Sequence, residues 1–164
     1  MKIYFAADHA GYELKNILLG FARDYLRAEV EDCGAHVFDK DDDYPALIAG
    51  AAKKLSEDAA AGRESRAVII GASGQGEAMV ANRFPRVRCA LYYGAPSGKQ
   101  TDMSGNDLDM LSSTRQHNDS NALALGARFL TADEAQEALR HWLTVPFPGE
   151  ARHARRIKSI ELQG

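Results

Sequence analysis

The loop from Gly71 to Glu77 of this 164-residue chain combines a hydroxyl, three glycines and a carboxylate directly after an apolar run. Glycines allow backbone N–H groups to approach an anion closely. Glu77 is suited to remove a proton next to a carbonyl, while Ser73 and the backbone amides of the loop would hold the developing oxyanion. The alternatives are a tight strand-to-helix turn without a ligand and a carboxylate that only favours the helix dipole.

Two known phosphate-binding loops do not fit this glycine loop. A dinucleotide fingerprint needs a third glycine at the position of Met79, and a P-loop needs a Gly-Lys-Ser/Thr sequence that does not follow. The chemistry therefore rests on Ser73 and Glu77 rather than on a nucleotide motif.

Two histidines stand beside groups that would help them act. Asp8 and His9 follow the first apolar run and provide an acid and an imidazole together, although such a pair also occurs as a helix N-cap and its neighbour. His117, in the stretch from Arg115 to Asn118, is of a residue type suited to move protons near neutral pH, and its alternative is an ordinary surface histidine.

Basic residues crowd near the C-terminus of a chain that carries a net charge of −3. Arg152 and Arg156 are four residues apart and would share one helix face, which suits two-point binding of a phosphate. Together with Arg128 they favour a small phosphorylated ligand. A solvated basic helix end is the alternative.

These motifs need a fold that brings strand ends together. Strand-like stretches are expected over 2–7, 30–37, 67–70, 87–92 and 122–125, and helical periodicity over 12–26, 46–55, 78–82 and 132–143. Their alternation predicts an α/β fold: a three-layer α/β/α, Rossmann-like sandwich with a mainly parallel five-stranded sheet. Every polar motif is then expected beyond the carboxyl ends of the strands. The run Lys40-Asp41-Asp42-Asp43 indicates a solvated loop, and the polar segment 94–113 a lid, a mobile loop or a surface insertion.

Length and composition set the broad class. A chain of 164 residues with 45% hydrophobic and 26% charged residues predicts one globular domain over 1–164. The acidic balance disfavours nucleic acid and membrane surfaces as partners, and without an apolar span or a secretory signal the cytoplasm is expected. Cys33 and Cys89 lack metal-ligand spacing and are expected to be reduced and structural.

Six motifs follow one another along nearly the whole chain: Asp8-His9-Ala10-Gly11, Asp43-Tyr44-Pro45, Gly71-Ala72-Ser73-Gly74-Gln75-Gly76-Glu77, Ala81-Asn82-Arg83, Arg115-Gln116-His117-Asn118 and Arg152-His153-Ala154-Arg155-Arg156. Each is weak alone, but together and in this order they closely resemble the ribose-5-phosphate isomerase type B family. The resemblance implies an aldose–ketose isomerase without metal or cofactor, which interconverts ribose 5-phosphate and ribulose 5-phosphate through an enediolate.

The resemblance also implies a role for each matching position. Asp8 and His117 would help to open the sugar ring, and Ser73, Gly74 and Gly76 would hold the enediolate. The phosphate would be taken by His9, Arg128, Arg152 and Arg156, and the sugar site would be lined by Tyr44, Gly71 and Asn118. A homodimer, or a dimer of dimers, with shared active sites is implied, in which the C-terminal segment 149–164 contacts the partner subunit.

The chain departs from the commoner branch of this family at two places. Gly71 occupies the position of a cysteine that acts as the base there, and Glu77 matches a glutamate of the actinobacterial-type branch. The segment 94–113 looks longer than usual and, because it precedes His117, is expected to alter substrate choice. Other sugar phosphates remain alternatives as substrates (galactose 6-phosphate, allose 6-phosphate or a tetrulose phosphate), as does a non-catalytic phosphosugar-binding protein.

Overall fold

The computed structural model describes residues 1–98, 100–102 and 105–162. Five strands and six helices occur in this described part of the chain. The strands are β1 (Lys2–Ala7), β2 (Glu29–Asp32), β3 (Ser65–Gly71), β4 (Cys89–Tyr92) and β5 (Ala122–Gly126). The helices are α1 (Tyr12–Asp24), α2 (Tyr44–Ala60), α3 (Gln75–Ala81), α4 (Met110–Asn118), α5 (Ala132–Thr144) and α6 (Ala151–Glu161). No helix among these is long and apolar enough to cross a membrane.

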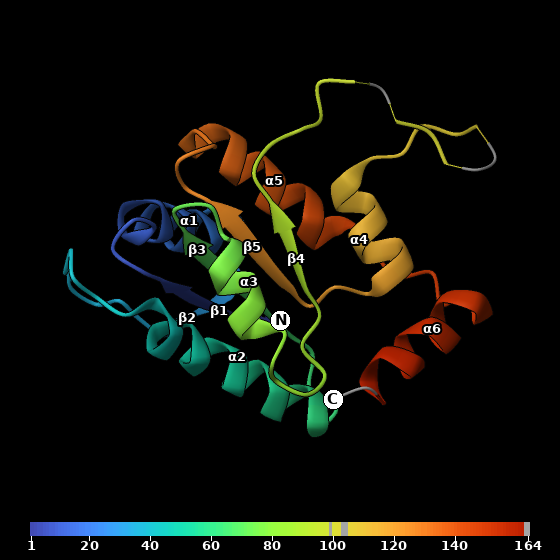
Figure 1. Cartoon of the computed structure of the whole chain (residues 1–164), viewed down its shortest axis with the longest axis horizontal. Coiled ribbons are helices and arrows are strands. Elements are labelled where there is room, and N and C mark those ends of the chain that lie inside the picture. The colour runs from blue at the N-terminus through green and yellow to red at the C-terminus, as the bar shows by residue number, and fades with distance from the viewer. Residues whose placement is uncertain (99, 103–104, 163–164) are drawn as a thin grey trace.

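All five strands run parallel in the order β2-β1-β3-β5-β4. Strands and helices alternate along the chain up to α5, so each strand returns to the sheet through a crossover (Figure 1). The predicted α/β sandwich with a five-stranded parallel sheet is confirmed, and the carboxyl ends of the strands share one edge.

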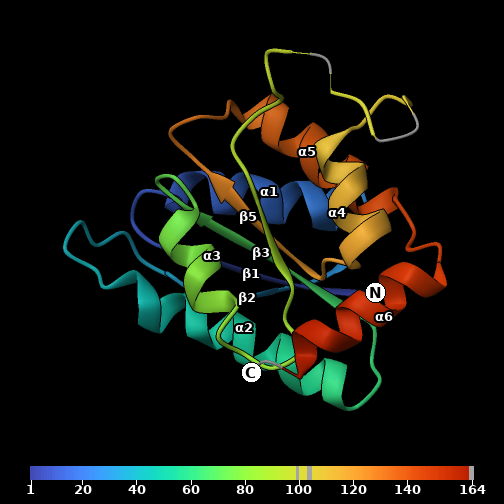
Figure 2. The same ribbon diagram turned by 45° about the vertical axis from the view of Figure 1, so that its right-hand side comes forward.

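Successive side chains along each strand point to alternate faces of the sheet, so they pack into two separate hydrophobic cores. On one face Ile3, Phe5 and Val68 pack against α1 and α5. On the other face Tyr4 and Ala67 pack against α2 and α3. Figure 2 shows the three layers, with the sheet between these two pairs of helices. The apolar run Ala67 to Ile70 is buried on both faces, as a central parallel strand requires.

Local signals fix where several helices begin. Pro45 lies in the first turn of α2, where its missing N–H costs no hydrogen bond. At α5, Thr131 accepts a hydrogen bond from the backbone N–H of Glu134, whose side chain accepts one from the backbone of Thr131. This capping box satisfies two donors that have no partner inside the helix.

Two of the expected segments end four or five residues earlier than predicted. The strand expected over 30–37 stops at Asp32, because Gly34 has a φ of 117° and the chain turns there. The loop expected over 94–113 ends at Asp109, whose carboxylate caps α4 by accepting the N–H of Ser112. Of that loop, residues 99, 103 and 104 lie outside the described residues, as do 163 and 164 of the C-terminal segment.

The two cysteines are free, as expected. Burial raises the pKa of Cys33 to about 11 and that of Cys89 to about 12. Both therefore stay thiols at neutral pH, which agrees with a structural role.

Candidate active site

The loops that follow β1, β3 and β5 meet at the carboxyl edge of the sheet. The backbone N–H groups of Ala127 and Arg128 donate to the carbonyls of Gly71 and Ala72 at 2.8 and 3.0 Å. The N–H of Asp8 donates to the carbonyl of Ile70 at 3.3 Å. These bonds hold the three loops together, so that side chains from separate parts of the sequence share one site.

Glu77 lies in the first turn of α3 and is only 5% exposed. Burial raises the pKa of its carboxyl group, and the nearby charge of Asp8 adds to that effect. A buried carboxylate with a raised pKa accepts a proton more readily than an exposed glutamate, which is what a general base near neutral pH requires.

The missing side chain of Gly71 makes room for Glu77. A Cβ atom at Gly71 would lie 2.5 Å from Oε2 of Glu77 and closer still to Cδ and Oε1. The carboxylate therefore occupies the space that a side chain at position 71 would fill. A base carried by residue 71 and a base carried by residue 77 would thus reach the same point of the site.

The rest of the glycine loop shapes the space around α3. Gly74 caps α3 with a φ of 75°, a conformation that L side chains rarely adopt. A Cβ atom at Gly76 would lie 2.8 Å from the hydroxyl oxygen of Tyr44, so the phenol rests directly against this helix. The Oγ of Ser73 accepts a weak 3.4 Å hydrogen bond from the N–H of Gln75. The predicted residues Tyr44, Ser73 and Glu77 are therefore brought together.

Asp8 faces the same site from the end of β1. Its side chain is buried, and its Oδ1 accepts the N–H of Gly11 at 2.9 Å. The alternative interpretation of Asp8 as a helix N-cap is wrong, because Gly11 occupies the N-cap position of α1. Asp8 is close enough to Glu77 to raise its pKa, so the site holds two carboxyl groups.

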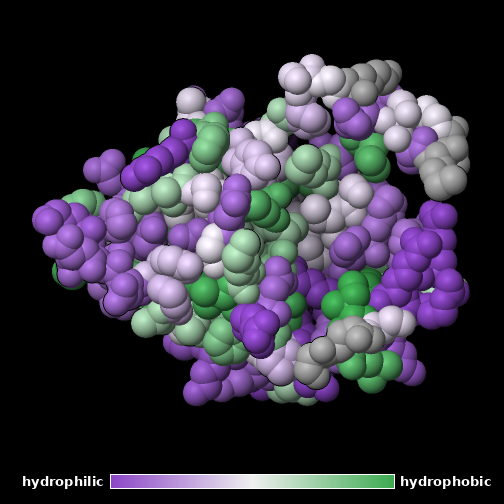
Figure 3. Space-filling model, viewed as in Figure 1, coloured by the Kyte–Doolittle hydropathy of each residue, from purple (hydrophilic) through white to green (hydrophobic). Residues whose placement is uncertain are grey.

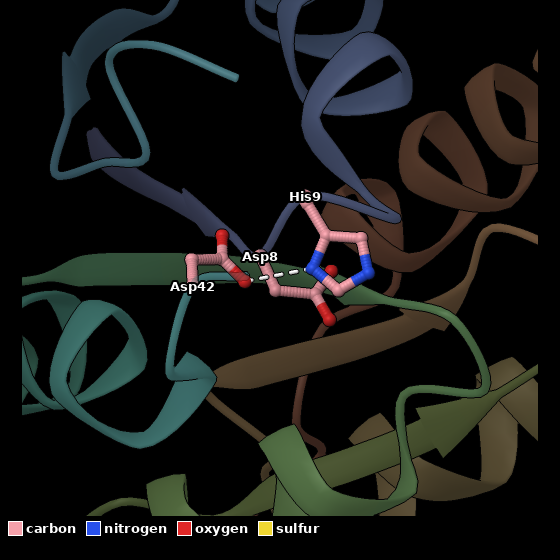
Figure 4. Close-up of side chains that lie close together, drawn as sticks. All are labelled: Asp8, His9 and Asp42. Atoms are coloured by element: carbon pink, nitrogen blue, oxygen red, sulfur yellow. Dashed lines mark hydrogen bonds and ion pairs between the residues drawn. The ribbon is translucent and has the colours of Figure 1, made fainter. Parts of the chain in front are cut away.

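His9 is hydrogen-bonded to Asp42, a residue that the sequence did not single out. Nδ1 of His9 lies 2.7 Å from Oδ1 of Asp42 (Figure 4). The expectation of a solvated loop over 40–43 is wrong at Asp42, whose side chain is only 10% exposed. The adjacent Asp43-Tyr44-Pro45 motif was the available signal, since it places this loop beside the site.

Among the described residues, the spacing of Asp8, His9 and Asp42 would also suit a metal ion, because one potential ligand atom from each lies within 4.8 Å of the others. A metal held by all three would need His9 and Asp42 to give up the hydrogen bond between them. An anion at the other ring nitrogen, Nε2, would leave that hydrogen bond intact. The arrangement thus suits an anion near His9, and the exposed Arg128 provides a second cationic group on the same side.

His117 and Asn118 lie away from this edge, which corrects the expectation that every motif lies beyond the carboxyl ends of strands. They end α4, and residues 119–121 lead straight into the amino end of β5. Since a strand rises about 3.3 Å per residue, β5 separates the two edges by roughly 13 Å. One chain therefore does not bring His117 to Glu77.

The C-terminal helix joins His117 in a second group of predicted site residues. The ring of His117 stacks on that of His153, with centroids 4.5 Å apart, and Arg152 donates to the carboxylate of Glu150 at 3.0 Å. Arg156 is exposed on the same helix, α6. The predicted site residues thus form two groups: one at the carboxyl edge, and one on α4 and α6 (Figure 1).

Comparison with known proteins gives a consistent answer over nearly the whole chain. The Ribose/Galactose Isomerase family model matches residues 3–160. Ribose-5-phosphate isomerase B of Mycobacterium tuberculosis is 34% identical over 157 residues, covering 96% of this chain and 86% of the relative. The corresponding protein of Mycolicibacterium paratuberculosis is 32% identical, with 96% and 87% covered.

Solved structures agree with the sequence relatives. Ribose-5-phosphate isomerase B of Mycoplasma genitalium with bound ribulose 5-phosphate superposes with a TM-score of 0.83 at 29% identity, covering 99% of this chain and 95% of that one. The Clostridium thermocellum ribose-5-phosphate isomerase B gives a TM-score of 0.79 at 32% identity, with 99% and 97% covered.

Proposed function

This chain belongs to the ribose/galactose isomerase family, and we propose that it interconverts ribose 5-phosphate and ribulose 5-phosphate with Glu77 as the base. The reaction is an aldose–ketose isomerisation. In the forward direction Glu77 takes the proton from C2 of the open-chain aldose, and the electron pair of the C2–H bond forms a C1–C2 double bond. The carbonyl oxygen at C1 becomes the oxyanion of an enediolate.

The second half of the reaction returns the proton. The protonated Glu77 donates it to C1, where the electron pair of the C1–C2 double bond forms the new C1–H bond. The proton of the C2 hydroxyl passes to the oxyanion on C1, and the electron pair of that O–H bond forms the ketone at C2. The hydroxyl of Ser73 and the backbone amides of Gly74 and Gly76 are the donors that we assign to the enediolate oxygens. We assign to Asp8, whose charge is close enough to raise the pKa of Glu77, a part in opening the sugar ring together with His117.

The observation that carries the assignment of the base is the space at Gly71. The carboxylate of Glu77 fills the volume where a side chain at position 71 would begin, and it is buried there. Burial raises its pKa towards the range in which a carboxylate exchanges protons efficiently near neutral pH. Gly71 thus contributes to the site by leaving room for the base, beside the sugar-lining role expected for it.

We assign the remaining predicted residues to two subunits of a homodimer. His9 and Arg128 bind the phosphate from one chain, and Tyr44 lines the sugar. His117, Asn118, Arg152 and Arg156 lie on the other side of the same chain and would complete the site of a partner. A complete site then requires a second copy of this chain, because neither group alone contains all of the predicted site residues.

The surface between the two groups favours such a contact. A hollow of about 420 Å³ lies there, lined by residues that include Leu91, Asn118 and Ile160. Met79 on α3 and Ile160 on α6 are 69% and 53% exposed. In Figure 3, hydrophobic residues gather over α3 and β4 and again beside α6. Contact between two copies would remove this apolar surface from water.

The direct test of the base is Glu77→Gln, which keeps the shape of the side chain and removes its basicity. We expect kcat for ribose 5-phosphate to fall by about a thousandfold, while KM changes little. In D₂O the wild-type enzyme should place deuterium at C1 of the ketose product, and the variant should lose this exchange in proportion to kcat. Near wild-type turnover would exclude Glu77 as the base.

The shared site is tested by mixing two inactive variants, Glu77→Gln and His117→Gln. A mixed dimer contains one site with both changes and one intact site, so refolding the two chains together should recover about a quarter of wild-type activity. A site contained within one chain would recover none.

A cytoplasmic location stays a prediction, which imaging of a tagged chain would test.

A further inference from the structure

The hydrogen bond between His9 and Asp42 joins two parts of the fold that are 33 residues apart. His9 directly follows Asp8 at the end of β1, and Asp42 lies two residues before α2. In Figure 4 the second ring nitrogen of His9, Nε2, points away from Asp42. No hydrogen bond to Nε2 occurs among the described residues, so this nitrogen is open to a ligand.

The loop that carries Asp42 is fixed at both ends. Behind it, the fully buried Lys15 binds the carboxylate of Asp32 at 2.6 Å and the carbonyl of Ala35 at 2.7 Å. The N–H of Asp42 donates to the carbonyl of Asp39 at 3.2 Å, which closes a turn just before α2. Asp42 is therefore held in place by the fold and not by chance contact with His9.

The carboxylate of Asp42 needs a cation beside it. Its side chain is nine-tenths buried, and its Oδ2 is buried without a hydrogen-bond partner. Burying a carboxylate that is only partly hydrogen-bonded is costly unless an opposite charge stands nearby. Among the described residues, the group that hydrogen-bonds this carboxylate through a side chain is the imidazole of His9, so its protonated form is favoured.

The charges around His9 act in the same direction on balance. The hydrogen bond to Asp42 is the main cause that raises the pKa of His9, and the negative charges of Asp8 and Asp42 add to it. Partial burial and the positive charge of Arg128 oppose this rise. The ring of Phe38 meets that of His9 edge-on at 6.5 Å and brings no ionisable group.

We propose that Asp42 is a positioning residue for substrate binding: it holds Nδ1 of His9, so that the imidazole presents a protonated Nε2 to the phosphate group. This inference rests on the proposed function, because it needs a phosphorylated substrate at His9. A phosphate that is largely dianionic near neutral pH gains a charge-assisted hydrogen bond from an imidazolium, whereas a neutral imidazole offers a weaker contact. Asp42 thereby extends phosphate binding to higher pH.

The test compares Asp42→Asn with Asp41→Asn, its neighbour in sequence. Asp41 is exposed and pairs with Lys40, so Asp41→Asn changes the net charge of the loop by the same amount without touching His9. KM for ribose 5-phosphate is measured at pH 6, where imidazole is largely protonated in any case, and at pH 8. The ionisation of the phosphate itself is common to all variants and cancels in the comparison.

We expect Asp42→Asn to raise KM about tenfold at pH 8 and much less at pH 6, in keeping with the loss of one charge-assisted contact. Asp41→Asn should leave KM unchanged at both pH values. An Asp42→Asn effect of the same size at pH 6 and pH 8 would show a purely structural role and would overturn the inference.

A second measurement does not depend on turnover. Long-range ¹H–¹⁵N spectra report the protonation of His9, which is assigned from the spectrum of His9→Gln, with inorganic phosphate as the probe. In the wild-type chain, His9 should be protonated at pH 7 and its signals should shift with phosphate; in Asp42→Asn it should be largely neutral, and phosphate should bind more weakly. Unchanged protonation in Asp42→Asn would refute the inference even if the isomerase activity is confirmed. Absent turnover with an intact His9 response would refute the proposed function alone.

Discussion

Replacing Gly71 with alanine tests whether the site depends on the space that this glycine leaves. The new Cβ atom would lie 2.5 Å or less from the carboxylate of Glu77, whereas ordinary contacts of a Cβ begin near 3.4 Å. Gly71 does not have a positive φ, so alanine fits the backbone and the strain falls on the side chain of Glu77. That carboxylate must move by about 1 Å.

A displacement of this size lowers the rate strongly. Misplacing a reacting group by about 1 Å costs roughly a hundredfold in rate, which equals about 3 kcal/mol in the activation free energy. We expect Gly71→Ala to lower kcat for ribose 5-phosphate by that factor. Steady-state kinetics gives kcat, and thermal unfolding shows whether the fold is retained. Gly20→Ala, at a helical glycine with no atoms within 4 Å of the added Cβ, is the matched control.

The double variant Gly71→Ala, Glu77→Gln separates this mechanism from direct contact between Gly71 and the sugar. If the alanine acts by moving Glu77, the double variant should have nearly the same kcat as Glu77→Gln alone. The reason is that both changes remove the same catalytic contribution, that of the base. A hundredfold further loss in the double variant would refute the reasoning and return Gly71 to a substrate-lining role.

Three further outcomes are expected. Asp8→Asn removes a negative charge that raises the pKa of Glu77, so the acid limb of kcat/KM against pH should move to lower pH; an unmoved limb would contradict this electrostatic coupling. Lys15→Met breaks a buried ion pair and should lower the free energy of unfolding by about 3 kcal/mol, or Tm by roughly 10 °C. Lys53→Met, at an exposed pair, should lower the free energy of unfolding by under about 1 kcal/mol. Equal losses in the two variants would refute this difference between the buried and the exposed pair. Shortening the loop between β4 and α4 should change the ratio of kcat/KM between pentose and hexose phosphates, and unchanged ratios would exclude it as a specificity element.

The three-layer arrangement of the fold could be predicted from the local hydrophobic pattern of the sequence. Apolar β-branched runs such as Ala67 to Ile70 alternate with helical periodicity, and this alternation permits few arrangements other than a parallel sheet between helices. The glycine loop and Glu77 follow one of these runs directly. Their meeting at the carboxyl edge could therefore be predicted without coordinates.

Contacts between distant residues were decided only by the tertiary structure. The run of aspartates at 41–43 is typical of a solvated loop, yet the fold buries Asp42 against His9. His117 was expected beyond the carboxyl ends of the strands, but α4 runs back along the sheet and carries it to the opposite edge. Gly71 is another case in which the sequence alone was not sufficient. The sequence shows that residue 71 has no side chain, but only the structure shows that the carboxylate of Glu77 fills that space. Local propensity acts over a few residues, whereas these placements depend on how the strands are ordered in the sheet.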